Sequence, residues 1–133
     1  MTASKKTILY IDDDPDDREL LNITIGDLSP QLKLVEAENG LKGLEYLNHA
    51  KDSNELPCLV VIDINMPLLD GRQTLDRIRE DELLKGLPVV IFTSSENPHD
   101  RSYFNRRGVQ MISKPMDVTY LKKIAQNMIS MCG

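Results

Sequence analysis

Short apolar runs alternate along the chain with longer segments in which apolar residues recur every three or four positions. The apolar runs have the length of β-strands, and the longer segments have the spacing of amphipathic helices. The runs cover residues 7–11, 32–37, 58–63, 89–92 and 109–113. The pattern therefore predicts five consecutive β–α units.

Helix starts are marked by capping residues. Asp14 followed by Pro15 is typical of a helix start, and Asn39 and Asp117 mark two more. Residues 48–56 are predicted as a polar link, and about 98–107 as a weaker helix that ends at Gly108.

The residues expected to face the core are Leu20, Leu21, Ile23, Thr24, Ile25 and Leu28, then Leu41, Leu44 and Leu47, then Leu75, Ile78 and Leu83, and finally Leu121, Ile124, Ala125, Met128 and Ile129.

Strands that alternate with helices of this length indicate crossover connections and a parallel sheet covered on both faces. Most of the runs are continuously apolar, as strands buried on both faces should be, whereas 32–37 alternates and reads as an edge strand. We therefore predict a doubly wound α/β fold in which residues 1–133 form a single domain without an output domain. In such sheets the ligand site lies beyond the carboxyl ends of the strands.

Composition narrows the function classes. The net charge of -5 argues against a nucleic-acid surface, which needs a basic stripe. No apolar run approaches the ~18 residues of a membrane span, and no signal peptide precedes the first strand. The sequence is expected to be cytoplasmic, with neither nucleic acid nor membrane as a partner.

The two cysteines are expected to be unrelated. Cys58 opens a strand and reads as a small core residue, while Cys132 lies at the fraying end of the last helix. Neither has the spacing of a zinc site or a redox pair.

Carboxylates and one lysine follow the strand ends. Asp12 and Asp13 come after the first strand, Asp63 closes the third and Lys114 follows the fifth. Two carboxylates ~4 Å apart repel by about 4 kcal/mol at an effective dielectric near 20. If these strand ends meet, a cation must be part of the site, and Lys114 can supply one positive charge.

The same cluster suits a hard divalent ion such as Mg²⁺, which takes carboxylates, carbonyls, water and phosphate oxygens. Asp12, Asp13 and Asp63 are the expected metal ligands, together with the backbone carbonyl of Asn65. With the hydroxyl of Thr93 and the ammonium of Lys114, the set fits phosphoryl transfer. Asp63 would be the nucleophile and form an aspartyl phosphate, and Thr93 and Lys114 would contact the phosphoryl oxygens.

These residues resemble the receiver domain of response regulators, the chemotaxis-regulator type. The resemblance rests on Asp12-Asp13, on Asp63 before Ile64-Asn65-Met66-Pro67, on Thr93 and on Lys114-Pro115, in that order. It implies a flavodoxin-like sandwich with strand order 2-1-3-4-5 and Mg²⁺ as the cofactor. It also implies that a sensor histidine kinase or histidine phosphotransfer protein phosphorylates Asp63. Such a domain catalyses its own phosphorylation and slow autodephosphorylation but is not a turnover enzyme.

One position departs from the family. Receivers usually carry an aromatic residue three positions before the lysine, and this chain has Met111. The output routes implied are a partner protein, onward phosphotransfer, or a homodimer through the face formed by about 98–107, 109–113 and the last helix. The segments 48–56 and 79–85 resemble single-domain receivers that work with phytochrome-type kinases.

The same residues also allow interpretations other than a phosphorylated receiver. Asp14, Asp16 and Asp17 are read as solvated acids that favour the helix N-terminus. The enzymatic alternative is a haloacid-dehalogenase-like, Mg²⁺-dependent phosphohydrolase that also works through an aspartyl phosphate. Such enzymes place a second Asp two residues after the nucleophile, where this chain has Asn65. A structural pseudo-receiver is a third alternative, against which the intact acid pair, Asp63 and Lys114 argue.

Overall fold

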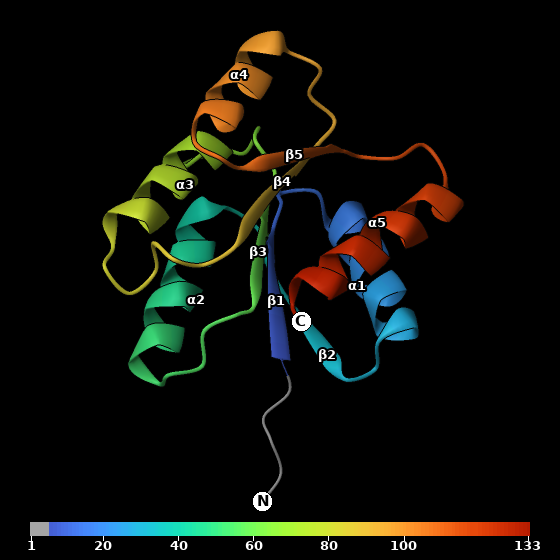
Figure 1. Cartoon of the computed structure of the whole chain (residues 1–133), viewed down its shortest axis with the longest axis horizontal. Coiled ribbons are helices and arrows are strands. Elements are labelled where there is room, and N and C mark those ends of the chain that lie inside the picture. Colours follow the sequence, from blue (N-terminus) through green and yellow to red (C-terminus); the bar gives the residue numbers. More distant parts are fainter. Residues whose placement is uncertain (1–5) are drawn as a thin grey trace, which may run out of the picture.

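Five parallel strands form one sheet in the order β2-β1-β3-β4-β5 in the computed structural model, which describes residues 6–133 (Figure 1). The predicted fold class and strand order are thus confirmed. The strands are β1 (Lys6–Ile11), β2 (Leu32–Ala37), β3 (Leu59–Ile62), β4 (Val89–Thr93) and β5 (Gln110–Ser113).

The helices cover both faces of this sheet. They are α1 (Pro15–Leu28), α2 (Gly40–Asp52), α3 (Gly71–Glu80), α4 (Pro98–Arg106) and α5 (Val118–Met131). In Figure 1, α1 and α5 lie on one side, and α2, α3 and α4 lie on the other. The predicted caps are present, since the side chains of Asp14, Asn39 and Asp117 each accept a backbone N–H from the first turn of their helix.

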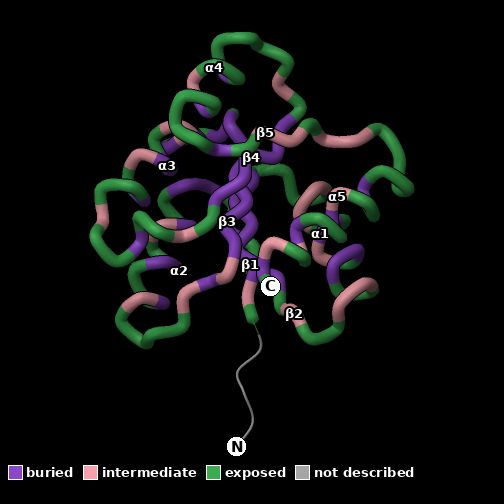
Figure 2. Tube along the Cα trace, viewed as in Figure 1, coloured by how far each residue is buried: buried purple, intermediate pink, exposed green. Residues whose placement is uncertain are grey.

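Alternate residues of the strands supply two cores. One core joins the sheet to α2, α3 and α4, and includes Ile11, Ile62 and Phe104. The other joins it to α1 and α5, and includes Tyr10, Val61 and Leu121. Figure 2 shows this as buried central strands within largely exposed outer helix surfaces. Strands buried on both faces explain the continuous apolar runs of the sequence.

The strand register brings the carboxyl ends level. Ile11 pairs with Ile62, and Ile62 pairs with Ile91. The backbone N–H of Asp63 donates to the carbonyl of Ile11 at 3.0 Å, and that of Lys114 to the carbonyl of Thr93 at 2.8 Å. The hydrogen bonding of the sheet therefore continues into Asp63 and Lys114, and it fixes the backbone positions from which their side chains extend.

Several helix boundaries and faces differ from the predictions. The predicted link 48–56 is helical as far as Asp52. Helix α3 ends at Glu80, where the extended backbone of Asp81 breaks it, so Leu83 is 65% exposed instead of facing the core. Leu20, Ile23 and Leu41 are also exposed. Helical spacing alone placed these residues on the margin of an apolar stripe, where burial depends on the neighbouring element.

The prediction that the cysteines are unrelated is wrong. Cys58 and Cys132 form a disulfide with a Cα–Cα distance of 5.0 Å. Helix α5 runs back along the sheet, and its 14 residues carry the chain roughly 21 Å, to the edge where β3 begins.

No helix among residues 6–133 is both long enough and apolar enough to cross a membrane.

Candidate functional site

Three of the predicted site residues meet at the carboxyl edge of the sheet. The ammonium Nζ of Lys114 lies 2.7 Å from Asp12 Oδ2 and 3.0 Å from Asp63 Oδ2. Asp12 is fully buried, Asp63 is nearly so, and the lysine side chain is 13% exposed. Three segments far apart in the sequence are thus joined by one partly buried cation.

A fourth carboxylate, which the sequence interpretation missed, shares this cation. Asp17 Oδ2 lies 2.8 Å from the Nζ of Lys114. The sequence did contain a signal for this contact. Asp17 lies one turn into the helix that follows Asp13, and a residue there lies over the carboxyl edge of β1. Asp14 and Asp16 keep the predicted role, since Asp14 Oδ1 accepts the backbone N–H of Asp16 at 2.9 Å and both residues are exposed.

The loop after β3 holds Asp63 through its backbone. The N–H of Ile64 donates to Asp63 Oδ1 at 2.8 Å, and the N–H of Gly71 donates to the carbonyl of Ile64 at 2.8 Å. A Cβ on Gly71 would lie 2.5 Å from the carbonyl oxygen of Asp63, which backbone atoms cannot relieve. Glycine is therefore needed at the start of α3 to let the helix approach the aspartate this closely.

Burial and charge set the protonation of the pair. Burial raises the pKa of Asp63, and the charge of Asp12 raises it further, while Lys114 and the hydroxyl of Thr93 oppose the rise. Burial alone would lower the pKa of Lys114, but its hydrogen bonds with Asp12 and Asp17 and the charge of Asp63 raise it overall. Lys114 therefore remains charged, and its ammonium limits the rise in the pKa of Asp63.

Asp12 is fixed by three donors. The phenol of Tyr10 donates to Oδ2 at 2.6 Å, the backbone N–H of Asp14 donates to Oδ1 at 2.9 Å, and Lys114 supplies the third. Burial raises the pKa of Tyr10, and so do the charge of Asp12 and their hydrogen bond. The phenol of Tyr10 therefore stays protonated and continues to donate to Asp12. The three donors together hold the side chain of Asp12 in one position.

The acidic cluster has the chemistry of a divalent-metal site. Carboxylate oxygens of Asp12, Asp13 and Asp63 all lie within 4.8 Å of one another. Lys114 contacts three carboxylates, those of Asp12, Asp17 and Asp63, and Asp13 adds a fourth to the cluster, which leaves an excess of negative charge. Asp13 is exposed, so water can complete the coordination of an ion. A hard divalent cation fits this donor set; Asn65, which is exposed in the next loop, stays a predicted ligand.

Thr93 links the site to α4. Its Oγ1 is buried and accepts the backbone N–H of Ser95 at 3.2 Å. The hydroxyl of Ser95 donates to Asp100 Oδ2 at 2.7 Å, and Asp100 is a buried carboxylate of α4 that also pairs with Arg72 of α3. This connection was not predicted, because nothing in the spacing of a serine and an aspartate distinguishes it from a simple helix cap.

Methionine occupies the position three residues before Lys114, where receivers usually carry an aromatic residue. Met111 is half-buried and packs on the core shared with α4. Two aromatic side chains in the same core belong to Tyr103 and Phe104 of α4, and the phenol of Tyr103 donates to Asp76 Oδ2 at 2.9 Å. The guanidinium of Arg107 lies 3.5 Å from the centre of the Tyr103 ring. Any movement of an aromatic group here would therefore involve α4 rather than β5.

Comparison with known proteins agrees with this geometry. Residues 8–126 match the response regulator receiver domain. The response regulator Rre1 of a Synechocystis strain is 35% identical over 129 residues, which are 96% of this chain and 53% of that protein. The chain thus spans about half of that relative's length.

Two solved structures of response regulators, the first of them a phytochrome response regulator, are also similar. The phosphorylated cyanobacterial regulator RcpA has a TM-score of 0.83 at 26% identity, with 92% of this chain and 90% of that chain covered. The Mn²⁺-bound form of Rcp1, a regulator from Synechocystis, has a TM-score of 0.81 at 28% identity, with 94% and 92% covered.

Proposed function

The chain belongs to the response regulator receiver family, and from this premise we propose that Asp63 accepts a phosphoryl group from a histidine of a partner protein. The observation that carries the proposal is the contact of 3.0 Å between Asp63 Oδ2 and the Nζ of Lys114, beside the buried Asp12. Receiver domains are signalling domains, and the partner that supplies the phosphoryl group is a histidine kinase or a phosphotransfer protein.

The transfer moves one phosphoryl group between two nucleophiles. A carboxylate oxygen of Asp63 attacks the phosphorus as the P–N bond to the donor histidine breaks, and the bonding pair returns to the imidazole. Little covalent chemistry is required of other residues, because such transfers depend on position and on charge stabilisation. Lys114 stabilises negative charge on a phosphoryl oxygen, and the hydroxyl of Thr93 donates to another.

The residues proposed to hold Mg²⁺ are Asp12, Asp13 and Asp63, with the carbonyl of Asn65. Mg²⁺ is a hard ion that binds carboxylates together with substrate phosphate, and when bound it supplies positive charge next to the phosphoryl oxygens. The Mn²⁺-bound structure of Rcp1 supports a divalent ion in a related response regulator. Asp12 contributes to the site independently, since it also holds Lys114 in place.

Output is proposed to run through protein contacts. Residues 1–133 are proposed to form one receiver domain, since all five strands between residues 6 and 133 belong to a single sheet. The chain of contacts from Thr93 through Ser95 to Asp100 supports a response at α4. A homodimer through the face made by α4, β5 and α5 is one form of output, and the similarity to RcpA supports a phytochrome-type kinase as the partner.

The phosphohydrolase alternative is not favoured. A general acid would be needed two residues after Asp63, where Asn65 cannot donate a proton in this way. The nucleophile also follows the third strand of the sheet, and the family match covers this entire arrangement.

Treatment with acetyl phosphate tests the proposal. In the presence of Mg²⁺, intact-protein mass spectrometry is expected to show one added phosphoryl group, which is lost on hydroxylamine treatment, as an acyl phosphate should be. Omission of Mg²⁺ with a chelator should remove the adduct. Many turnovers of a small phosphomonoester would instead identify a phosphohydrolase, and no adduct at all would contradict a receiver function.

An apolar surface beside the site predicts how the phosphoryl donor docks. Met116 is fully exposed, and Leu20 and Val118 are also exposed beside it. They line a hollow of about 120 Å³ that reaches Lys114. A partner that brings a histidine to Asp63 must cover this surface, so Met116→Glu is expected to slow phosphotransfer from a phosphorylated histidine protein by at least tenfold. Phosphorylation by acetyl phosphate, measured in parallel, should be unchanged because that donor needs no docking.

Leu83→Glu provides the matched control. Leu83 is another exposed apolar residue, but it precedes β4 at the opposite edge of the sheet. Its variant should keep the wild-type rates with both donors. Equal slowing by the two substitutions would mean that charge, rather than docking at Met116, is responsible.

A further inference from the structure

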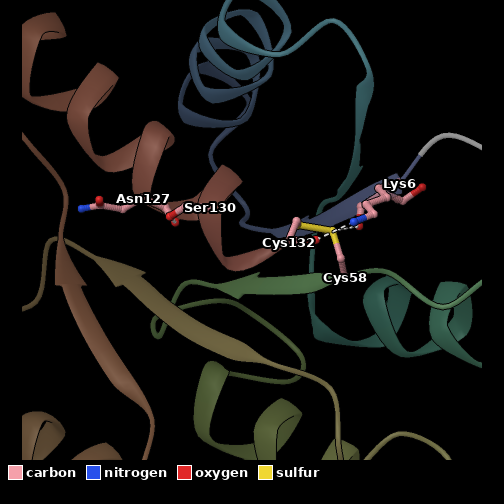
Figure 3. The surroundings of a disulfide bond; sticks show 6 residues. Lys6, Cys58, Asn127, Ser130 and Cys132 are labelled. Atoms are coloured by element: carbon pink, nitrogen blue, oxygen red, sulfur yellow. Dashed lines mark hydrogen bonds between the residues drawn. A yellow bond between two sulfur atoms is a disulfide. The ribbon is translucent and has the colours of Figure 1, made fainter.

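Two cysteines that are 74 positions apart in the sequence meet at the amino edge of the sheet. Cys58 lies directly before β3, and Cys132 follows the last turn of α5 (Figure 3). Their Cα–Cα distance of 5.0 Å lies within the range of protein disulfides, so the backbone needs no movement to join them. The backbone around Cys58 is fixed by the sheet, since its N–H donates to the carbonyl of Thr7 at 2.8 Å.

The disulfide borders a hollow in the surface. A hollow of about 670 Å³ is lined by both cysteines, and Lys6, Lys33 and Glu55 also line it. Cys58 is half-buried, whereas Cys132 is almost fully buried. Two ammonium groups against one carboxylate favour the approach of an anionic thiol or disulfide, and a reacting thiol can therefore attack at Cys58 first.

We propose that Cys58 and Cys132 form a reversible redox site that fastens the end of α5 to the sheet. The oxidant class is a low-molecular-weight disulfide. The thiolate of Cys58 attacks one of its sulfurs, which forms a mixed disulfide and releases one thiolate. The thiolate of Cys132 then attacks Cys58 in that mixed disulfide and releases the second thiolate. Two protons leave the cysteines, and two electrons reduce the small disulfide to two thiols; the same steps in reverse restore the free cysteines.

The bond controls the end of one helix rather than the phosphoryl chemistry. Cys58 and Asp63 lie at opposite ends of β3, roughly 16 Å apart at strand spacing. Apart from the disulfide, the end of α5 is held by a hydrogen bond of 2.9 Å from the Nζ of Lys6 to the carbonyl of Cys132 (Figure 3). Among residues 6–133, reduction therefore leaves this hydrogen bond from the exposed Lys6 as the one polar contact between the end of α5 and the sheet, beside the apolar packing of Met128 and Met131. This inference does not depend on phosphorylation of Asp63.

Equilibration of the wild-type chain in mixtures of reduced and oxidised glutathione tests the proposal. Alkylation and mass spectrometry give the fraction of the intramolecular disulfide, calorimetry gives the melting temperature, and hydrogen exchange reports on the last turn of α5. The disulfide fraction should rise from near zero to near one across the series. The oxidised form should melt on the order of 10 °C higher, since closing a long loop restricts the unfolded chain. Exchange in the last turn should slow at least tenfold on oxidation.

Variants separate the bond from other effects of oxidation. The double variant Cys58→Ser with Cys132→Ser should have one melting temperature throughout the series. The rate of phosphorylation by acetyl phosphate should change less than twofold between the two wild-type forms. A disulfide that persists at every ratio, or that never forms, would overturn a reversible site, and so would stable glutathione adducts on Cys58 without ring closure. A melting temperature that does not follow the disulfide fraction would overturn the role at α5.

Discussion

Asp63→Asn is expected to abolish the phosphoryl adduct and, in the absence of metal, to raise the melting temperature. The first effect follows because the amide is not a nucleophile toward phosphorus, whereas a carboxylate is. The second follows because Asp63 is buried next to Asp12, so its negative charge opposes folding. The amide keeps the shape and can still accept the N–H of Ile64. Mass spectrometry and calorimetry on the same samples measure both results.

The sign of the pH dependence follows from the raised pKa of Asp63. A carboxyl group whose pKa is raised by folding contributes stability below its unfolded-state pKa and loses it as pH rises through the folded value. The wild type loses that contribution as the pH rises, whereas Asp63→Asn, which has no carboxyl group there, does not. The difference in melting temperature should therefore shrink as the pH falls below about 4, the ordinary range of an aspartate.

Asp27→Asn is the matched control for Asp63→Asn. Asp27 is an exposed carboxylate near the end of α1, and its variant should retain the full adduct. A phosphoryl group that persists in Asp63→Asn would assign the modification to another residue. A lower melting temperature in that variant would mean that the contact with Lys114 outweighs the burial of the charge.

The sequence was sufficient to predict the order of elements and the meeting of charged residues at the strand ends, because both follow from local rules. Continuous apolar runs identify strands buried on both faces, and parallel strands end at one edge, so Asp12, Asp63 and Lys114 had to approach one another. Charge repulsion then required a cation. No knowledge of side-chain packing was needed for these steps.

The features that were missed depend on the direction of helices in space. Asp17 was read as an acid at a helix start, although the first turn of α1 leans over the strand ends and brings it to Lys114. Cys132 was read as a fraying end, although α5 returns it to Cys58. Leu83 followed the periodicity of α3 beyond the residue at which that helix stops. Periodicity describes a helix by itself, whereas these contacts require the position of its neighbours.

Lys114→Met is expected to lower the rate of phosphorylation by acetyl phosphate about 100- to 1000-fold, the usual effect of losing one group that stabilises charge in a transition state. Lys114 contacts three carboxylates, and its removal leaves them without that cation. The free energy of unfolding without metal should therefore fall by about 3 kcal/mol, as for a broken buried ion pair. Mass spectrometry of samples quenched at successive times measures the phosphorylation rate, and denaturant titrations measure the free energy of unfolding.

A comparison of single and double variants separates the two roles of Lys114. Lys122→Met, which removes an exposed lysine of α5, should leave both the rate and the stability near the wild-type values. Asp63→Asn should stabilise the Lys114→Met protein more than it stabilises the wild type, because the carboxylate it removes has lost its cation there. Equal stabilisation in both backgrounds would mean that Asp63 and Lys114 do not interact in the folded protein. A rate unchanged in Lys114→Met would leave charge stabilisation at the phosphoryl group to the metal and Thr93 alone.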